Sequence, residues 1–197
     1  MKDTVSFFLR LSIPVCVILG VFVFGSADFG YFTNLSNLWI LAATAIYLVP
    51  AARTRKVWYL ALYVCTVSIF LTFLVFSTML APRMGVKFLR SPENVLVHFV
   101  VPILSIIDWL CLVPPMEMKK WDFCWATLPP LLYIGYVCVR VSLRIPFGKS
   151  LDTVPYFFLD WEKLGPKVLL WCLLLTVFVL VFGWLFIFLQ KKIQKTK

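Results

Sequence analysis

Six long stretches of mostly apolar residues follow one another along the chain, and this succession constrains the fold more than any other feature. They cover residues 5–25, 31–50, 57–80, 95–113, 123–141 and 168–189. A helix of about 20 apolar residues crosses the ~30 Å hydrocarbon core of a bilayer. Because backbone exposed to lipid must satisfy its own hydrogen bonds, each stretch is predicted to be a transmembrane helix. We therefore expect an all-α integral membrane protein in which residues 1–197 form a single bundle of six helices.

The composition supports this prediction. Hydrophobic residues make up 62% of the chain and charged residues only 14%, whereas a soluble domain carries about 25% charged residues. There are too few charges to cover a water-facing surface, and no polar stretch is long enough to form a separate soluble domain. A cytosolic enzyme, a DNA-binding module and a disordered protein are thereby excluded. The net charge of +10 lies in short clusters between apolar stretches, so no nucleic-acid partner is predicted.

The distribution of Lys and Arg predicts the orientation. With six spans, one side of the membrane collects Lys2, Arg10, Arg53, Arg55, Lys56, Lys119, Lys120, Lys191, Lys192, Lys195 and Lys197. The other side collects the smaller set Arg83, Lys87, Arg90, Arg140, Arg144, Lys149, Lys163 and Lys167. The richer side is cytoplasmic by the positive-inside rule, so both termini are expected in the cytoplasm. The first stretch also has features of a signal peptide, but Arg10 interrupts it and we count it as a span.

Polar groups inside the predicted spans are costly and often functional, and Thr33, Asn37, His98 and Asp108 are singled out among them. Thr33 and Asn37 are four residues apart and share a helix face. His98 is the only histidine of the chain. Asp108 lies ten residues further along the same helix, about 15 Å from His98. Asp108 therefore cannot orient the imidazole directly, and we expect it to have a structural role or to belong to a second site.

Thr33 and His98 are predicted at matched depth. Each lies near the outer start of its helix, and the two helices run in the same direction. A hydroxyl and an imidazole placed in this way can form a pair of nucleophile and base. The structural alternatives stay open, because Thr33 can cap or pack a helix and His98 can be a buried, satisfied residue.

Two short motifs resemble the androgen-induced protein/ADTRP family of small multi-pass membrane proteins. They are Tyr31-Phe-Thr-Asn-Leu-Ser-Asn37 and Asn94-Val-Leu-Val-His-Phe-Val-Val-Pro102. The resemblance implies a threonine hydrolase that cleaves fatty acid esters of hydroxy fatty acids, with Thr33 and His98 as the essential residues. The segment from Pro155 to Asp160 is similar to microbial relatives. The resemblance thus implies the plasma membrane of a microbe, with an internal eukaryotic membrane as the alternative.

Supporting roles are assigned to other polar residues. Asn37 is expected to hydrogen-bond the developing oxyanion, and Asp160 is the candidate acid for positioning His98. Arg140 or Arg144 is expected to hold the carboxylate of a fatty-acid-like substrate, unless both are ordinary interfacial charges. The expected partners are a lipid-like ester and membrane lipids. The oligomeric state does not follow from the sequence.

No metal or cofactor is predicted. The six cysteines all lie within predicted spans without C-x-x-C spacing, which gives no support to a disulfide framework, a zinc site or a redox pair. No glycine-rich phosphate loop or other cofactor motif is present.

The competing function is non-enzymatic: a small-solute transporter or a membrane scaffold. Pro14, Pro102 and the Pro129–Pro130 pair then mark bends that open a path, although the inverted repeat typical of transporters is not apparent. A continuous polar path across the bundle favours transport. A cavity open only near Thr33 and His98 favours hydrolysis.

Overall fold

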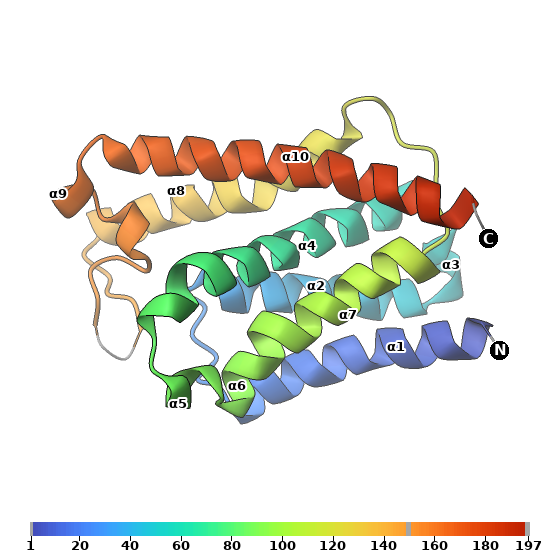
Figure 1. Cartoon of the computed structure of the whole chain (residues 1–197), viewed down its shortest axis with the longest axis horizontal. Helices are drawn as coiled ribbons and strands as arrows, with labels where there is room; N and C mark the ends of the chain where they lie inside the picture. The colour runs from blue at the N-terminus through green and yellow to red at the C-terminus, as the bar shows by residue number, and fades with distance from the viewer. Residues whose placement is uncertain (1, 149–150, 196–197) are drawn as a thin grey trace.

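The computed structural model describes residues 2–148 and 151–195, and helices dominate it (Figure 1). The long helical segments are α1 (Lys2–Val17) with η1 (Ile18–Val23), α2 (Phe32–Leu48), α4 (Lys56–Val75) with η2 (Phe76–Leu80) and η3 (Ala81–Arg83), α6 (Pro92–Val95) with η4 (Leu96–Val100), α7 (Val101–Ile107) and η5 (Asp108–Leu112), η6 (Asp122–Thr127) with α8 (Leu128–Ser142), and α10 (Lys167–Lys195). The short elements between them are α3 (Pro50–Arg53), α5 (Val86–Leu89), η7 (Phe157–Leu159) and α9 (Trp161–Leu164).

Within the described residues, five helices are long and apolar enough to cross a membrane. They are Thr4–Val23, Lys56–Arg83, Pro92–Leu112, Asp122–Ser142 and Lys167–Lys195. The all-helical class and these five apolar helices confirm the predicted architecture at that level. The stretch expected over residues 31–50 instead forms the shorter apolar helix Phe32–Leu48.

The early end of α2 has a local cause. Proline disfavours the helical conformation in the residue before it, and Val49 accordingly takes an extended conformation with φ −75° and ψ 122°. Pro50 then begins α3. A six-span count therefore stays a prediction, which depends on how α2 sits in the bilayer.

The helices lie roughly along one common direction, and the two ends of the bundle differ (Figure 1). The start of α1 and the end of α10 lie at the same end, together with α3. The short helices α5 and α9 lie at the opposite end. In the interior, α4 packs against α2 and α7, and α1 also packs against α2.

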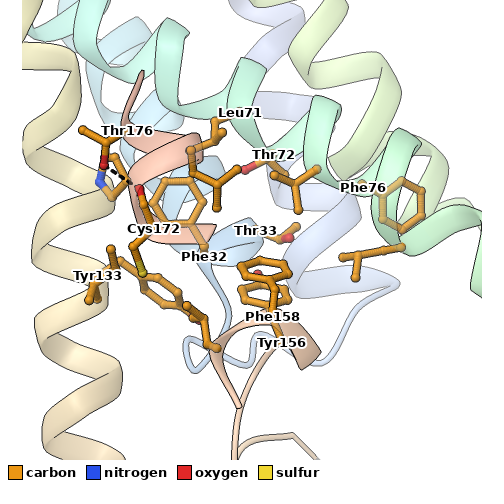
Figure 2. A pocket seen from close by; sticks show the side chains of 16 residues that line it. Phe32, Thr33, Leu71, Thr72, Phe76, Tyr133, Tyr156, Phe158, Cys172 and Thr176 are labelled. Carbon is orange, nitrogen blue, oxygen red and sulfur yellow. Dashed lines mark hydrogen bonds between the residues drawn. The ribbon is translucent and has the colours of Figure 1, made fainter. Parts of the chain in front are cut away.

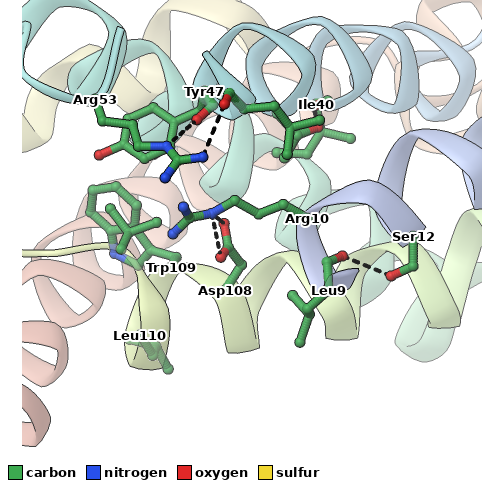
Figure 3. A network of polar contacts seen from close by, with 12 residues as sticks. Leu9, Arg10, Ser12, Ile40, Tyr47, Arg53, Asp108, Trp109 and Leu110 are labelled. Atoms are coloured by element: carbon green, nitrogen blue, oxygen red, sulfur yellow. Dashed lines mark hydrogen bonds and ion pairs between the residues drawn. The ribbon is translucent and has the colours of Figure 1, made fainter. Parts of the chain in front are cut away.

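A buried ion pair joins α1 to η5 (Figure 3). Arg10 Nε lies 2.8 Å from Asp108 Oδ1 and 3.1 Å from Oδ2, and the two side chains are only 3% and 2% exposed. The guanidinium of Arg10 also lies over the ring of Tyr47, 5.2 Å from its centroid. Asp108 therefore has a structural partner, in line with one of the two roles expected for it.

Two glutamines attach α10 to the end of η5. Gln190 is fully buried; its Nε2 donates to the carbonyl oxygens of Trp109 and Val113, both at 3.0 Å. Its Oε1 accepts a hydrogen bond from the Tyr59 hydroxyl at 2.7 Å. Gln194 Nε2 donates to Val113 O at 2.7 Å. Carbonyl groups at a helix end lack intrahelical partners, and these side chains satisfy them.

Candidate functional site

A mostly apolar pocket opens between α2, α4, α8 and α10 in the half of the bundle that carries α9 (Figure 2). The segment from Tyr156 to Leu159 closes one side of it. The volume of the pocket that is open to water-sized molecules is about 60 Å³, which is enough for several water molecules. Its polar groups are the hydroxyls of Thr33, Thr72, Tyr133, Tyr156 and Thr176, together with the Cys172 thiol.

Thr33 lies in the first turn of α2 and is half-buried against the pocket. Tyr31, in an extended conformation, precedes the helix, so the turn that carries Thr33 begins beside the closing segment. In Figure 2, Thr33 lies between Thr72 and the paired rings of Tyr156 and Phe158. The structure thus places the predicted nucleophile on the wall of a pocket.

The Thr33 hydroxyl differs from three other hydroxyls of the pocket in the group with which it interacts. Thr72 shares a 2.7 Å hydrogen bond with Ser36, Thr176 donates to Cys172 O, and Tyr133 donates to Gly30 O. These bonds hold the Thr72 hydroxyl to α2, the Tyr133 hydroxyl to the segment before α2, and the Thr176 hydroxyl to its own helix. The Thr33 side chain instead interacts with the phenol of Tyr156.

The phenol oxygen of Tyr156 lies at the start of α2. The polar groups that interact with this oxygen are the Thr33 side chain, the Tyr133 hydroxyl and the backbone of Phe32 and Thr33. Backbone N–H groups in a first helical turn lack intrahelical partners, so they are available as donors to an oxygen placed there. Burial raises the pKa of Tyr156 to about 12. The phenol is therefore neutral near pH 7 and cannot act there as a base.

His98 lies on the π-helical segment η4 and is 7% exposed. Its ring stacks on Phe76, with centroids 3.6 Å apart and planes 9° apart. Phe76 lines the pocket, whereas His98 stands behind it and is not part of the lining. The buried Nδ1 of His98 has no hydrogen-bond partner within the described residues.

Asn37 links the turn of Thr33 to the turn of His98. Its Nδ2 donates to Thr33 O at 2.8 Å and to Val97 O at 3.2 Å. One side-chain nitrogen thus bridges the residue of the predicted nucleophile and the neighbour of the predicted base. In the described part of the chain, however, no hydrogen bond joins the Thr33 and His98 side chains. Both N–H groups of the amide are engaged, so the oxyanion role expected for Asn37 stays a prediction.

Asp160 is bonded to Lys163 rather than to His98. It caps α9 by accepting a hydrogen bond from Lys163 N at 3.1 Å, and it forms an ion pair with Lys163 Nζ at 2.9 Å. The hydrogen bond from Lys163 lowers the pKa of Asp160. The structure therefore does not bring the predicted positioning acid to the imidazole.

The two predicted substrate arginines do not line the pocket. Arg140 Nη1 donates to the Tyr136 hydroxyl at 2.9 Å, and Nη2 donates to Pro146 O. Its guanidinium lies 4.4 Å from the centroid of the Phe147 ring. Arg144 is exposed at the end of α8, with φ +56°. Arg140 thus stabilises the loop after α8, and carboxylate binding by either arginine stays a prediction.

Sequence reasoning did not assign Tyr156 and Thr72 to the site. Tyr156 belongs to the segment singled out by the family resemblance, so a signal for it was present. Thr72 lies within an apolar helix and gave no signal, because only the approach of α2 brings Ser36 to it. Within the described residues, no group of three or more His, Cys, Asp or Glu is placed to hold a metal ion.

Comparisons of this chain with family models, with curated proteins and with solved structures found no match.

Proposed function

We propose that this chain is an intramembrane hydrolase that cleaves an amphiphilic ester, with Thr33 as nucleophile and His98 as general base. One observation carries the proposal: the Thr33 hydroxyl faces an apolar pocket, and Asn37 ties its turn to the turn of the chain's only histidine. A threonine hydroxyl is a weak nucleophile without a base to accept its proton. The two hydrogen bonds of Asn37 support a pairing of Thr33 with His98 in the proposed site.

The proposed reaction has two steps. The Thr33 oxygen attacks the ester carbonyl while His98 accepts its proton, and the imidazolium then protonates the departing alcohol, leaving an acyl-threonine. His98 next activates a water molecule that hydrolyses this intermediate. In the resting geometry the imidazole reaches the hydroxyl through one bridging water or by rotation of Phe76, since catalytic contacts are often long before substrate binds.

The first turn of α2 supplies the proposed oxyanion donors. The backbone N–H groups of Phe32 and Thr33 face the Tyr156 oxygen. A substrate carbonyl that displaces this phenol takes its place at the helix N-terminus, where negative charge is favoured. In the resting structure the Asn37 amide instead donates to Thr33 O and Val97 O, which positions this turn.

We further propose six spans with both termini cytoplasmic. The 17 residues of α2 extend about 25 Å, close to the hydrocarbon thickness, and the start of α1 and the end of α10 lie on one side of the bundle (Figure 1). That side holds the larger share of Lys and Arg, so the pocket lies toward the outer leaflet. The family resemblance places the protein in a microbial plasma membrane, with an internal eukaryotic membrane as the alternative.

Ester turnover in proteoliposomes tests the enzymatic proposal. Wild type, Thr33→Ala, His98→Ala and the control Thr78→Val are assayed with a set of amphiphilic esters. Thr78 is an exposed threonine whose hydroxyl bonds to Leu74 O outside the pocket. We expect both site variants to lose activity and the control to keep it. Turnover that survives Thr33→Ala in folded protein contradicts the proposal.

A further inference from the structure

A second cavity lies beside the pocket of Thr33. The volume of this cavity that is open to water-sized molecules is about 290 Å³. Its walls come from the outer half of α8, the start of α10 and the segment between them. Ile134, Leu159 and Cys172 line both cavities. The two spaces are therefore neighbours with a common wall of three side chains.

The second cavity lies between two helices that expose apolar side chains on the outside of the bundle. Val137 and Cys138 of α8 line one side of it, and Val168 and Cys172 of α10 line the other. Next to these positions both helices expose large apolar side chains on the outside of the bundle. Examples are Leu131, Leu132, Leu169 and Leu173. In a bilayer these outward faces contact acyl chains, which favours access to the cavity from the side, between α8 and α10.

Polarity changes from one cavity to the other. The pocket of Thr33 is mostly apolar, whereas the second cavity is also lined by Ser142, Thr153, Asp160 and Glu162. Within the residues that the structure describes, no Lys or Arg lines the second cavity, and the nearby Lys163 is already bonded to Asp160 through its backbone N–H and its Nζ. This lining offers hydrogen-bond acceptors and hydroxyls but no cation to pair with an anionic group.

We propose that the substrate is an ester with an uncharged, hydroxyl-bearing polar end, of the monoacylglycerol type, which enters from the bilayer between α8 and α10. The ester group lies at Thr33 with the acyl part against the apolar wall. The polyol end of the substrate extends past Ile134, Leu159 and Cys172 into the second cavity. There its hydroxyls donate hydrogen bonds to the carboxylates of Asp160 and Glu162. A free carboxylate at that end finds no positive partner and loses its hydration, which is costly. This inference rests on the proposed ester hydrolysis for its chemistry.

Photo-cross-linking tests the binding path separately from catalysis. The full chain in proteoliposomes is irradiated with a monoacylglycerol that carries a diazirine, and in parallel with the matched diazirine fatty acid. We expect cross-links in residues 134–142 and 153–172, and labelling by the glycerol probe about tenfold above that by the acid. Cys172→Trp fills the common wall and should abolish these cross-links. Leu173→Trp is the control, since Leu173 is 59% exposed and lines neither cavity.

A second matched pair keeps the test decisive if Cys172→Trp fails to fold. Ile134→Trp fills the same wall from α8, and Leu132→Trp adds the same bulk on the lipid-facing side. Cross-links that persist in both wall variants, or that are as strong with the fatty acid, overturn the inference. Cross-linking reports occupancy of the cavities and needs no turnover, so a failure of the hydrolase proposal leaves this readout intact. Conversely, ester turnover without cross-links in the two cavities rejects the path and retains the enzyme.

Discussion

Arg10 and Asp108, 98 residues apart in the chain, form an ion pair in the interior of the bundle, with Nε 2.8 Å from Oδ1. Loss of one partner leaves a buried charge without compensation, which typically costs about 3–5 kcal/mol. We expect Arg10→Met or Asp108→Leu alone to lower the free energy of unfolding by this amount. The double variant should recover most of the loss, since two apolar residues leave no charge. Thermal unfolding in nanodiscs measures both effects, and a double variant as unstable as the single ones would contradict the prediction.

Substitutions of Gln190 and Gln194 should reduce stability to different degrees. Gln190→Leu leaves the carbonyl oxygens of Trp109 and Val113 with fewer donors and removes the acceptor of the Tyr59 hydroxyl. Each unsatisfied buried group costs about 1–3 kcal/mol. Gln194→Leu, at a half-buried position, should cost less because Gln190 still donates to Val113 O. The order of the two unfolding midpoints in urea checks this prediction, and equal midpoints would count against it.

Gly20 and Gly135 should respond in opposite ways to the same substitution. A Cβ at Gly20 would lie 2.8 Å from Val97 Cγ1 and 3.0 Å from Leu96 Cβ, whereas none of the surrounding atoms lies within 4 Å of one at Gly135. Gly135→Ala should stabilise α8 by about 0.5–1 kcal/mol. Gly20→Ala should destabilise the protein by about 1–3 kcal/mol through overpacking. It should also slow ester turnover, because it displaces the segment of His98. If both substitutions stabilised the protein, η1 and η4 would have to be packed less closely than the structure shows, and the prediction would be wrong.

The pKa of Tyr156 predicts a dependence of stability on alkaline pH. Burial raises this pKa from 10.0 to about 12, so the unfolded chain loses the phenolic proton first. Stability contributed by the neutral phenol is complete below pH 10 and falls as the pH rises toward 12, by up to about 1.4 kcal/mol for each pH unit. Tyr156→Phe should lack this part of the decrease. Melting temperatures of the two proteins between pH 8 and 11 measure it, and parallel curves would disprove the assignment.

The apolar stretches predicted the helices because lipid exposure leaves a strong compositional signal. The stretch 57–80 became Lys56–Arg83, and 123–141 became Asp122–Ser142. The exception was α2, where Pro50 stopped the helix before the predicted end. The π-helical segments had no sequence signal, since packing between helices decides where one extra residue enters a turn.

The site was predictable where it depended on local sequence. Thr33 was placed on its helix start by the motif around it, whereas the stacking of His98 on Phe76 depends on long-range packing. Arg10 and Asp108 are opposite charges inside apolar spans and near the same predicted side of the membrane, so their pairing was a missed signal. The bond between Asp160 and Lys163 follows from N-cap spacing, which could have been recognised before Asp160 was assigned to His98.

Covalent capture of Thr33 tests the central claim most directly. A fluorophosphonate with a lipid-like tail is reacted with wild type, Thr33→Ala, His98→Ala and Thr78→Val, and the modified residue is identified by mass spectrometry after a check of folding. An activated hydroxyl predicts an adduct on Thr33 that is absent in Thr33→Ala and unchanged in Thr78→Val. Loss of the base in His98→Ala should slow the reaction by about 10²-fold or more. A folded wild-type protein that gains no adduct on Thr33, or one that reacts equally fast without His98, would contradict the account.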